Sequence, residues 1–289
     1  MPGRHAGNRD SVLITAAGLS RHLAVAGRPV ILDVRWRLDQ PDGYPAYLQG
    51  HLPGAVYVSL EDDLSDHTRR GRGRHPLPTG KAVEAAARRW GIGQNQSVVV
   101  YDDWNRAGSA RAWWVLTAAG LPDVRILDGG LRAWLAAGGA LQTGTPTPAP
   151  GDITIGHDDL YAGGRPTLTA EQIAAREGVT LLDARAPERF RGEAEPVDPV
   201  AGHIPGARNL PSTSTLGPDG RFLPGARLAG LLAESGVPDT GTVGVYCGSG
   251  VTASVLIAAL EAAGMDAALF PGSWSQWCAE DRPVSRGPD

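Results

Sequence analysis

The chain has 289 residues, of which 42% are hydrophobic and 20% charged, and its formal net charge is −4. These values are typical of a soluble protein with two domains, each able to bury a core. They lack the basic stripe that nucleic-acid binding favours, and no apolar run approaches the roughly 20 residues that span a bilayer. Because residues 1–10 are polar and contain no signal-peptide core, we expect a cytoplasmic protein without nucleic-acid or membrane partners.

The predicted elements alternate between helices and short buried strands. Residues 13–27 have the pattern of an amphipathic helix with Thr15 as its N-cap. Further along, short apolar runs predict strands, and two of these precede apolar segments long enough to be helices. The strands are at 30–32, 98–101 and 243–246, and the two helices at 109–119 and 252–263. This alternation predicts an α/β fold, with small parallel sheets that carry helices on both faces.

Four sequence motifs occur twice in the same order, which indicates a duplicated domain. The pairs are VILDVR at 30–35 with TLLDAR at 180–185, GHLPGA at 50–55 with GHIPGA at 202–207, SVVVYD at 97–102 with TVGVYC at 242–247, and LDGG at 127–130 with FPGS at 270–273. Alternating prolines between the copies favour an extended connector. We therefore expect an N-terminal domain at 1–140, a linker at 141–165 and a C-terminal domain at 166–289.

Cys247 and Cys278 are the two cysteines, too few for a disulfide framework and without nearby histidines for a zinc site, so no metal is expected. Cys247 follows a predicted strand and opens a glycine-rich loop, CGSGVT at 247–252, that leads into a helix. Inward-facing N–H groups of such a loop, together with the helix N-terminus, bind anions and stabilise a thiolate. We expect backbone dipoles to supply most of this positive potential, because the loop has no basic side chain. The predicted anion-binding residues of the loop are Gly248, Gly250, Val251 and Thr252.

The segment CGSGVTA at 247–253 resembles the active-site loop of 3-mercaptopyruvate sulfurtransferases, which form one branch of the rhodanese family. Thiosulfate sulfurtransferases form another branch and tend to carry basic residues where this chain has Gly248 and Ser249. Tyr47 with HLPGA at 51–55, and FPGSWSQW at 270–277, are similar to the family's two signatures, although Gln276 replaces the usual glutamate. The resemblance implies two tandem rhodanese-like domains and a covalent sulfurtransferase. A small anionic donor, 3-mercaptopyruvate or thiosulfate, would pass sulfur through a Cys247 persulfide to thioredoxin, a small thiol or cyanide, without any cofactor.

The same resemblance implies roles for individual residues. Arg189 would bind the anionic end of the donor, since a guanidinium suits a carboxylate or sulfonate. Ser249, His75 and an acid, Glu61 or Asp62, would form a proton relay built across the two domains. In the first copy Asp102 stands where Cys247 stands in the second, so that domain would lack a nucleophile.

Val197 occupies the place of a second substrate arginine found in mercaptopyruvate enzymes. This departure weakens the expectation that 3-mercaptopyruvate is the preferred donor, and Arg191 and Arg208 are candidates to replace the missing side chain. The basic run RRGRGR at 69–74 has two interpretations: a solvated surface loop, or the mouth of a site for an anionic substrate.

His51 and His203 recur in both copies, including the one without a nucleophile, so we expect them to be structural, as with the repeated Asp–Arg pairs at 33/35 and 183/185. Cys278 has no counterpart in the repeat and is expected to be incidental. Two other functions are alternatives to sulfur transfer. A cysteine phosphatase needs an arginine six residues after the cysteine, where this chain has Ala253. A non-enzymatic sulfur carrier or regulatory binding module is the other alternative.

Overall fold

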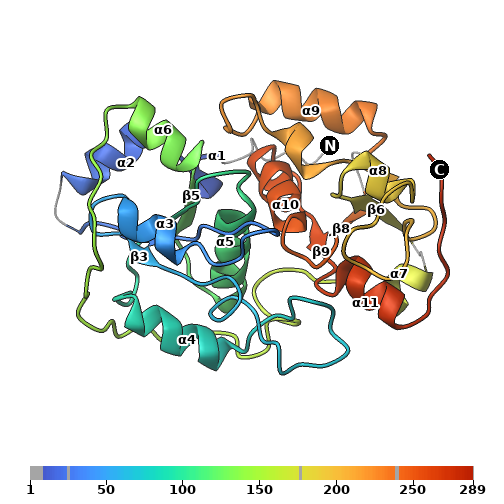
Figure 1. Ribbon diagram of the computed structural model, residues 1–289, viewed down its shortest axis with the longest axis horizontal. Helices are drawn as coiled ribbons and strands as arrows, with labels where there is room; N and C mark the ends of the chain where they lie inside the picture. Colours follow the sequence, from blue (N-terminus) through green and yellow to red (C-terminus); the bar gives the residue numbers. More distant parts are fainter. Residues whose placement is uncertain (1–8, 25–26, 176–177, 238–240, 289) are drawn as a thin grey trace.

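The computed structural model describes residues 9–24, 27–175, 178–237 and 241–288. The chain forms two α/β units side by side, each built on its own parallel sheet (Figure 1). In the first sheet the strand order is β1-β5-β4-β2-β3, and every neighbouring pair is parallel. Its strands are β1 (Leu13–Ile14), β2 (Val30–Asp33), β3 (Val56–Tyr57), β4 (Val98–Tyr101) and β5 (Val124–Leu127).

The second sheet repeats this arrangement, with the order β7-β6-β8-β9 and parallel pairing throughout. Its strands are β6 (Val179–Asp183), β7 (Arg208–Asn209), β8 (Thr242–Tyr246) and β9 (Ala268–Leu269). Thr167 forms a parallel bridge to Leu269, in the position that β1 takes beside β5 in the first sheet. The predicted α/β fold with two tandem domains is therefore confirmed.

Helices cover the sheets and supply the segments that approach the predicted loop. In the first unit they are α1 (Arg9–Val12), α2 (Ala16–Leu23), α3 (Tyr44–Gln49), α4 (Gly80–Arg89), α5 (Ala107–Ala119) and α6 (Gly130–Ala136). In the second they are α7 (Ala170–Ala175), α8 (Pro187–Phe190), the 3₁₀ helix η1 (Ser212–Thr215), α9 (Gly225–Glu234), α10 (Ala253–Ala262) and α11 (Ser273–Ala279). Within the described residues, none of these helices has both the length and the apolar character required to cross a membrane.

The helix predicted at 13–27 is shorter in the structure. Thr15 is its N-cap as expected, and the Thr15 hydroxyl accepts a hydrogen bond from the N–H of Gly18 at 3.0 Å. Leu13 and Ile14 lie outside the helix because they pair with Ile126 and Leu127 as an edge strand of the sheet. The predicted positions 25 and 26 lie outside the described residues.

The proline-rich connection runs back along the first unit. The N–H of Gly151 donates to the carbonyl of Arg88 at 2.8 Å, and the N–H of Gly164 donates to that of Ala118 at 2.8 Å. Leu160 from this segment is fully buried in the core. The expected linker is thus anchored to the first unit at several points along its length.

The repeated motifs make the same contacts in both units. An arginine two residues after a buried aspartate pairs with that carboxylate and donates to the carbonyl of the glycine that begins the repeated turn. The sets are Arg35 with Asp33 and Gly50, and Arg185 with Asp183 and Gly202. His51 stacks on Tyr47 with ring centroids 4.2 Å apart, and His203 stacks on Phe190 at 3.8 Å. Both histidines are fully buried, and these contacts fit a structural role.

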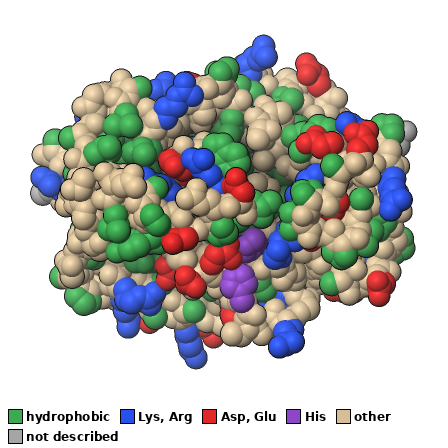
Figure 2. Space-filling model, viewed as in Figure 1, with side chains coloured by type: hydrophobic (Ala, Val, Ile, Leu, Met, Phe, Trp, Pro, Cys, Tyr) green, Lys and Arg blue, Asp and Glu red, His purple; other side chains and the backbone are tan. Residues whose placement is uncertain are grey.

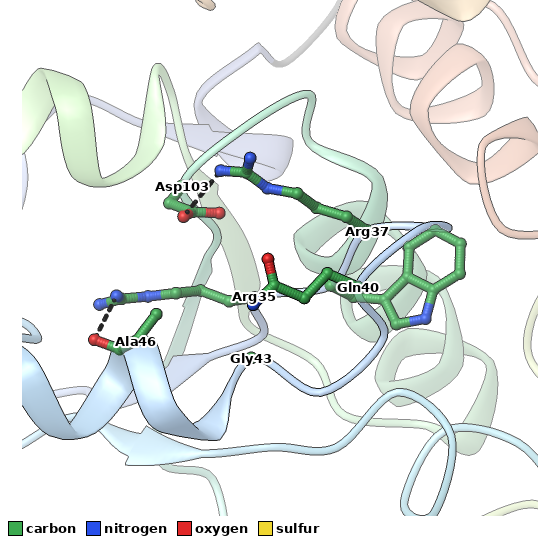
Figure 3. Close-up of a pocket in the computed structure, with 7 residues that line it drawn as sticks. Arg35, Arg37, Gln40, Gly43, Ala46 and Asp103 are labelled. Carbon is green, nitrogen blue, oxygen red and sulfur yellow. Dashed lines mark hydrogen bonds and ion pairs between the residues drawn. The ribbon is translucent and has the colours of Figure 1, made fainter.

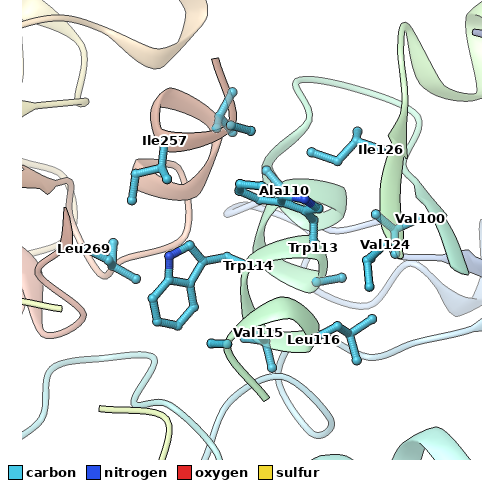
Figure 4. Packing of buried hydrophobic residues seen from close by; sticks show 14 of the residues in the cluster. Val100, Ala110, Trp113, Trp114, Val115, Leu116, Val124, Ile126, Ile257 and Leu269 are labelled. Carbon is cyan, nitrogen blue, oxygen red and sulfur yellow. The ribbon is translucent and has the colours of Figure 1, made fainter. Parts of the chain in front are cut away.

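The two units share one core, in which α5 of the first packs against α10 of the second (Figures 1 and 4). Trp113 and Trp114 of α5 are buried there, and Figure 4 shows the Trp114 side chain extending from α5 toward Leu269 and Ile257 of the second unit. Burying large aromatic side chains at this boundary fixes the relative position of the two sheets.

We expect Trp114→Ala to lower the free energy of unfolding by about 3–5 kcal/mol, because it leaves a large cavity between the units. Trp114→Phe should cost less, since the indole Nε1 is buried without a hydrogen-bond partner in the described structure. Trp104, which is 50% exposed, provides the control, and Trp104→Ala should change stability by less than about 1 kcal/mol. Denaturant unfolding measures all three, and equal effects of the two alanine variants would contradict the shared core.

Candidate active site

Cys247 directly follows β8, and its side chain is 2% exposed. The N–H of Gly250 points back at the Cys247 Sγ, with a nitrogen–sulfur distance of 3.1 Å. Gly250 has φ +81°, and a Cβ on it would lie 2.5 Å from the carbonyl oxygen of Pro271, so only glycine fits. The tight loop predicted from the glycines therefore delivers a backbone donor to the sulfur atom, where it stabilises a thiolate.

The start of α11 holds the backbone of this loop from the other side. The N–H of Cys247 donates to Ser273 Oγ at 3.2 Å. The carbonyls of Cys247 and Gly248 accept from the N–H groups of Trp274 (3.0 Å) and Ser275 (2.9 Å). The segment FPGSWSQW thus supplies hydrogen-bond donors to the carbonyls of the Cys247 loop.

The structure brings the predicted relay residues together across the two units. Ser249 Oγ lies 2.6 Å from His75 Nδ1, and His75 Nε2 lies 3.2 Å from Glu61 Oε1. The carboxylate of Asp62 is engaged elsewhere, since it accepts from the Ser59 hydroxyl at 2.8 Å. Of the two acids considered from sequence, Glu61 is the one beside His75.

Burial and hydrogen bonding set the charges of this trio. The hydrogen bond from His75, aided by one from Trp36 Nε1, lowers the pKa of Glu61 to about 2. Burial lowers the pKa of His75 below its ordinary value of 6.5, so the imidazole is neutral at pH 7. Because a carboxylate only accepts, His75 Nε2 carries the proton and Nδ1 accepts from the Ser249 hydroxyl. Figure 2 shows histidine and acidic side chains gathered near the middle of one face, between the units.

Two arginines, one from each unit, flank Gly248. Arg189 extends from α8 as expected, whereas Arg74 comes from the loop that precedes His75. A Cβ built on Gly248 would lie 3.1 Å from Arg74 Nη2 and 3.5 Å from Arg189 Nη1. Both guanidinium groups also contact the carboxylate of Asp198, Arg74 at 2.5 Å and Arg189 at 3.3 Å.

The two candidates to replace the arginine missing at Val197 are occupied elsewhere. Arg191 pairs with Glu193 at 2.7 Å near the surface, and Arg208 donates to the carbonyl of Gly236. Val197 itself is 37% exposed. The structure therefore gives no support to compensation by Arg191 or Arg208.

Arg111 of α5 is a third cation near the loop, and sequence reasoning missed it. Its side chain is fully buried and donates to the carbonyls of His75 (3.0 Å), Leu64 (3.1 Å) and Gly250 (3.5 Å). Burial lowers the pKa of Arg111 to about 10, so it stays charged at neutral pH. A lone arginine within an apolar helix was the available signal. The expectation that backbone dipoles supply most of the positive potential is therefore corrected: arginines outside the loop also contribute.

The matching loop of the first unit is filled by its own side chain. The carboxylate of Asp102 accepts from the N–H (3.1 Å) and hydroxyl (2.6 Å) of Ser109 and pairs with Arg106 at 2.7 Å. A carboxylate cannot carry a persulfide, and here it satisfies the donors that would otherwise bind an anion.

The second cysteine, Cys278, is unsuited to nucleophilic chemistry. Cys278 is 5% exposed, and burial raises the pKa of its thiol to about 12, which keeps it protonated.

The pocket in Figure 3 lies beside the Asp102 loop, and none of its lining residues belongs to the Cys247 loop. Its arginines are already paired, Arg37 with Asp103 at 3.2 Å and Arg35 with Asp33 at 2.9 Å.

Comparison with known proteins identifies the class to which this fold and site belong. Residues 15–137 and 167–280 both match the Rhodanese-like domain. The chain therefore belongs to the rhodanese family, with two copies of the domain in tandem, as the repeated motifs predicted.

Individual relatives are similar over almost the whole chain. "Putative thiosulfate sulfurtransferase SseB" of Mycobacterium tuberculosis is 66% identical over 96% of this chain and 98% of its own length. "Probable 3-mercaptopyruvate sulfurtransferase" of Pseudomonas aeruginosa is 44% identical over 95% and 98%. The crystal structure of SseA from Escherichia coli, of the 3-mercaptopyruvate sulfotransferases, superimposes with a TM-score of 0.80 at 30% identity, covering 92% of this chain and 99% of that one. These relatives confirm the predicted sulfurtransferase class.

The buried position of His75 beside Glu61 predicts the pKa of its imidazole. Its imidazole should titrate below pH 6.5, because burial disfavours the charged form more than Glu61 favours it. Glu61→Gln should lower the His75 pKa further, since it removes the nearby negative charge. NMR titration of the imidazole in both proteins measures this, and a His75 pKa above 6.5, or one raised by Glu61→Gln, would contradict the assignment.

Proposed function

We propose that Cys247 is the nucleophile of a sulfurtransferase that uses 3-mercaptopyruvate or thiosulfate as donor. The observation that carries this proposal is the Cys247 sulfur held against the N–H of Gly250 in a loop flanked by guanidinium groups. The thiolate attacks the transferable sulfur of the donor, and a new S–S bond gives a Cys247 persulfide. A thiol acceptor, such as thioredoxin or a small thiol, or cyanide then removes the outer sulfur and regenerates the thiolate.

The two donors place different demands on the relay. With 3-mercaptopyruvate the C–S bond breaks, and its electron pair goes to carbon as the enolate of pyruvate. The donor thiol gives up its proton, and that carbon gains one. We propose that Ser249 and neutral His75 take the proton from sulfur and return it to carbon, with Glu61 orienting the imidazole.

With thiosulfate the S–S bond breaks and sulfite leaves with the electron pair. Sulfite is a stable anion, so this step involves no proton transfer. The role of the site is then to bind the negative charge, for which Arg189 and the N–H groups of Gly248, Gly250, Val251 and Thr252 are suited. The neighbouring arginines beside Gly248 support this role.

Incubation with either donor should add one sulfur atom to Cys247, detected by intact-protein and peptide mass spectrometry. Cys247→Ser should abolish the adduct, whereas Cys278→Ser should leave it unchanged, because the Cys278 thiol is buried and protonated. Absence of the adduct with both donors would refute the proposed mechanism. An adduct that no acceptor removes would favour the non-enzymatic sulfur carrier.

Ser249→Ala should separate the two donors. We expect kcat/KM to fall about 100-fold or more for 3-mercaptopyruvate and less than about 10-fold for thiosulfate, since only the first reaction needs the proton relay. Ser254→Ala is a matched control, because this buried hydroxyl bonds to the Gly250 carbonyl at 3.3 Å rather than to His75. Steady-state kinetics with both donors measure the ratio, and equal losses for the two would exclude the relay.

A further inference from the structure

The Glu61 carboxylate bridges two histidines, and only one of them belongs to the proposed relay. Its Oε1 lies 3.2 Å from His75 Nε2 and accepts a hydrogen bond from Trp36 Nε1 at 2.7 Å. Its Oε2 lies 3.0 Å from Nε2 of His67. Because a carboxylate only accepts, His67 Nε2 carries a hydrogen and donates it. The His67 imidazole thus binds the carboxylate oxygen that the relay leaves free.

The position of Glu61 alone does not fix its carboxylate. The Glu61 side chain has three rotatable bonds and is 30% exposed, so water competes for its oxygens. Trp36 and His75 are both buried, but both of them bind Oε1. Donors on one oxygen restrain that atom, whereas a further donor on Oε2 also fixes the plane of the carboxylate. The hydrogen bond from His67 therefore completes the restraint on Glu61.

The backbone places His67 beside His75. The N–H of Asp66 donates to the carbonyl of Pro76 at 3.0 Å, which joins the residue before His67 to the residue after His75. The Asp66 carboxylate accepts from the N–H of Thr68 at 3.1 Å and so closes a turn around His67. The two imidazole rings lie with their centroids 6.0 Å apart. Backbone hydrogen bonds thus hold the second histidine next to the relay.

We infer that His67 is a positioning residue, which holds the Glu61 carboxylate with Oε1 toward His75 and so sustains the proton relay. The inference rests on the proposed function and deepens it, because it adds a residue that acts on the relay through Glu61. The His67 side chain is 50% exposed and lies on the solvent side of the carboxylate. Since the role concerns proton transfer, it applies to 3-mercaptopyruvate and not to thiosulfate.

The charges around His75 explain why the orientation of Glu61 matters. Burial lowers the pKa of His75, the Glu61 carboxylate raises it, and the nearby Arg111 and Arg74 lower it. If the carboxylate turned away, the imidazole would face the two cations without a compensating negative charge and would become a weaker base. A weaker base takes the proton from Ser249 less readily.

His67→Met and His67→Gln are a matched pair, because both side chains are of similar length and only glutamine keeps an N–H donor. We expect His67→Met to lower kcat/KM for 3-mercaptopyruvate roughly 5-fold to 10-fold, the effect of losing a half-exposed hydrogen bond to a carboxylate. His67→Gln should stay within about 2-fold of the wild type, and so should both variants with thiosulfate. Steady-state kinetics with the two donors measure these ratios. An unaffected His67→Met variant, equal losses in the two variants, or equal losses with the two donors would overturn the inference.

The His75 pKa provides a second measurement, which does not depend on turnover. It should be lower in His67→Met than in His67→Gln, because only glutamine holds the carboxylate against the imidazole while both variants remove the His67 ring. NMR titration of His75 measures the difference, and identical His75 pKa values in the two variants would overturn the inference. His22→Met, at an exposed histidine of α2, is the control and should leave the His75 pKa unchanged. A wild type that forms no persulfide with either donor refutes the proposed function, whereas the pKa difference still tests the role of His67.

Discussion

The packing of α5 against α10 is the contact on which the rest of the site depends. Each helix follows the loop of its own unit, so their contact sets both loops relative to each other. Trp113 and Trp114 fill the space between them and leave little freedom for sliding. With the two units fixed in this way, the segment from Glu61 to His75 lies over the Cys247 loop of the other domain.

Arg111 links this packing directly to the chemistry. It extends from α5, and its three hydrogen bonds reach the carbonyls of Leu64, His75 and Gly250, on both sides of the domain boundary. A buried guanidinium is costly unless its donors are satisfied, so these carbonyls are held to it. The same cation raises the positive potential beneath the loop.

The first unit contains the same loop with Asp102 in place of the proposed nucleophile. Asp102 and Cys247 occupy equivalent positions, and each is followed seven residues later by a serine, Ser109 or Ser254. In the first unit Ser109 and Arg106 donate to the carboxylate, so the loop binds an anion from its own chain. In the second unit the corresponding centre is a sulfur atom that accepts from Gly250. The fold therefore keeps the same loop in both copies, with a carboxylate at its centre in the first and the Cys247 sulfur in the second.

The sequence predicted features that depend on local pattern. The repeated motifs predicted the two sheets, and the glycines after Cys247 predicted the tight loop. The partners of His75 followed only from the family resemblance, and the choice between Glu61 and Asp62 needed coordinates because the residues are adjacent and both are acidic. Arg111 was not singled out, and Arg74 was considered only as part of the basic run 69–74, since nothing in their local sequence records which surface of the other domain they meet. Contacts across a domain boundary join residues far apart in the chain, and periodicity and spacing do not encode them.

Residues from both domains surround the Cys247 loop. The proposed nucleophile, Cys247, and its loop come from one domain, whereas Glu61, His75, Arg74 and Arg111 come from the other. The second domain alone would retain a cysteine beside a backbone N–H but would lose the proposed relay and two of the three nearby cations. A thiolate stabilised by loop and helix dipoles can still form there, but a reaction that must also move a proton and hold a donor anion cannot rely on those dipoles alone. In the proposed mechanism the copy that carries Asp102 is thus part of the active site, because its segment at 61–75 contacts the Cys247 loop.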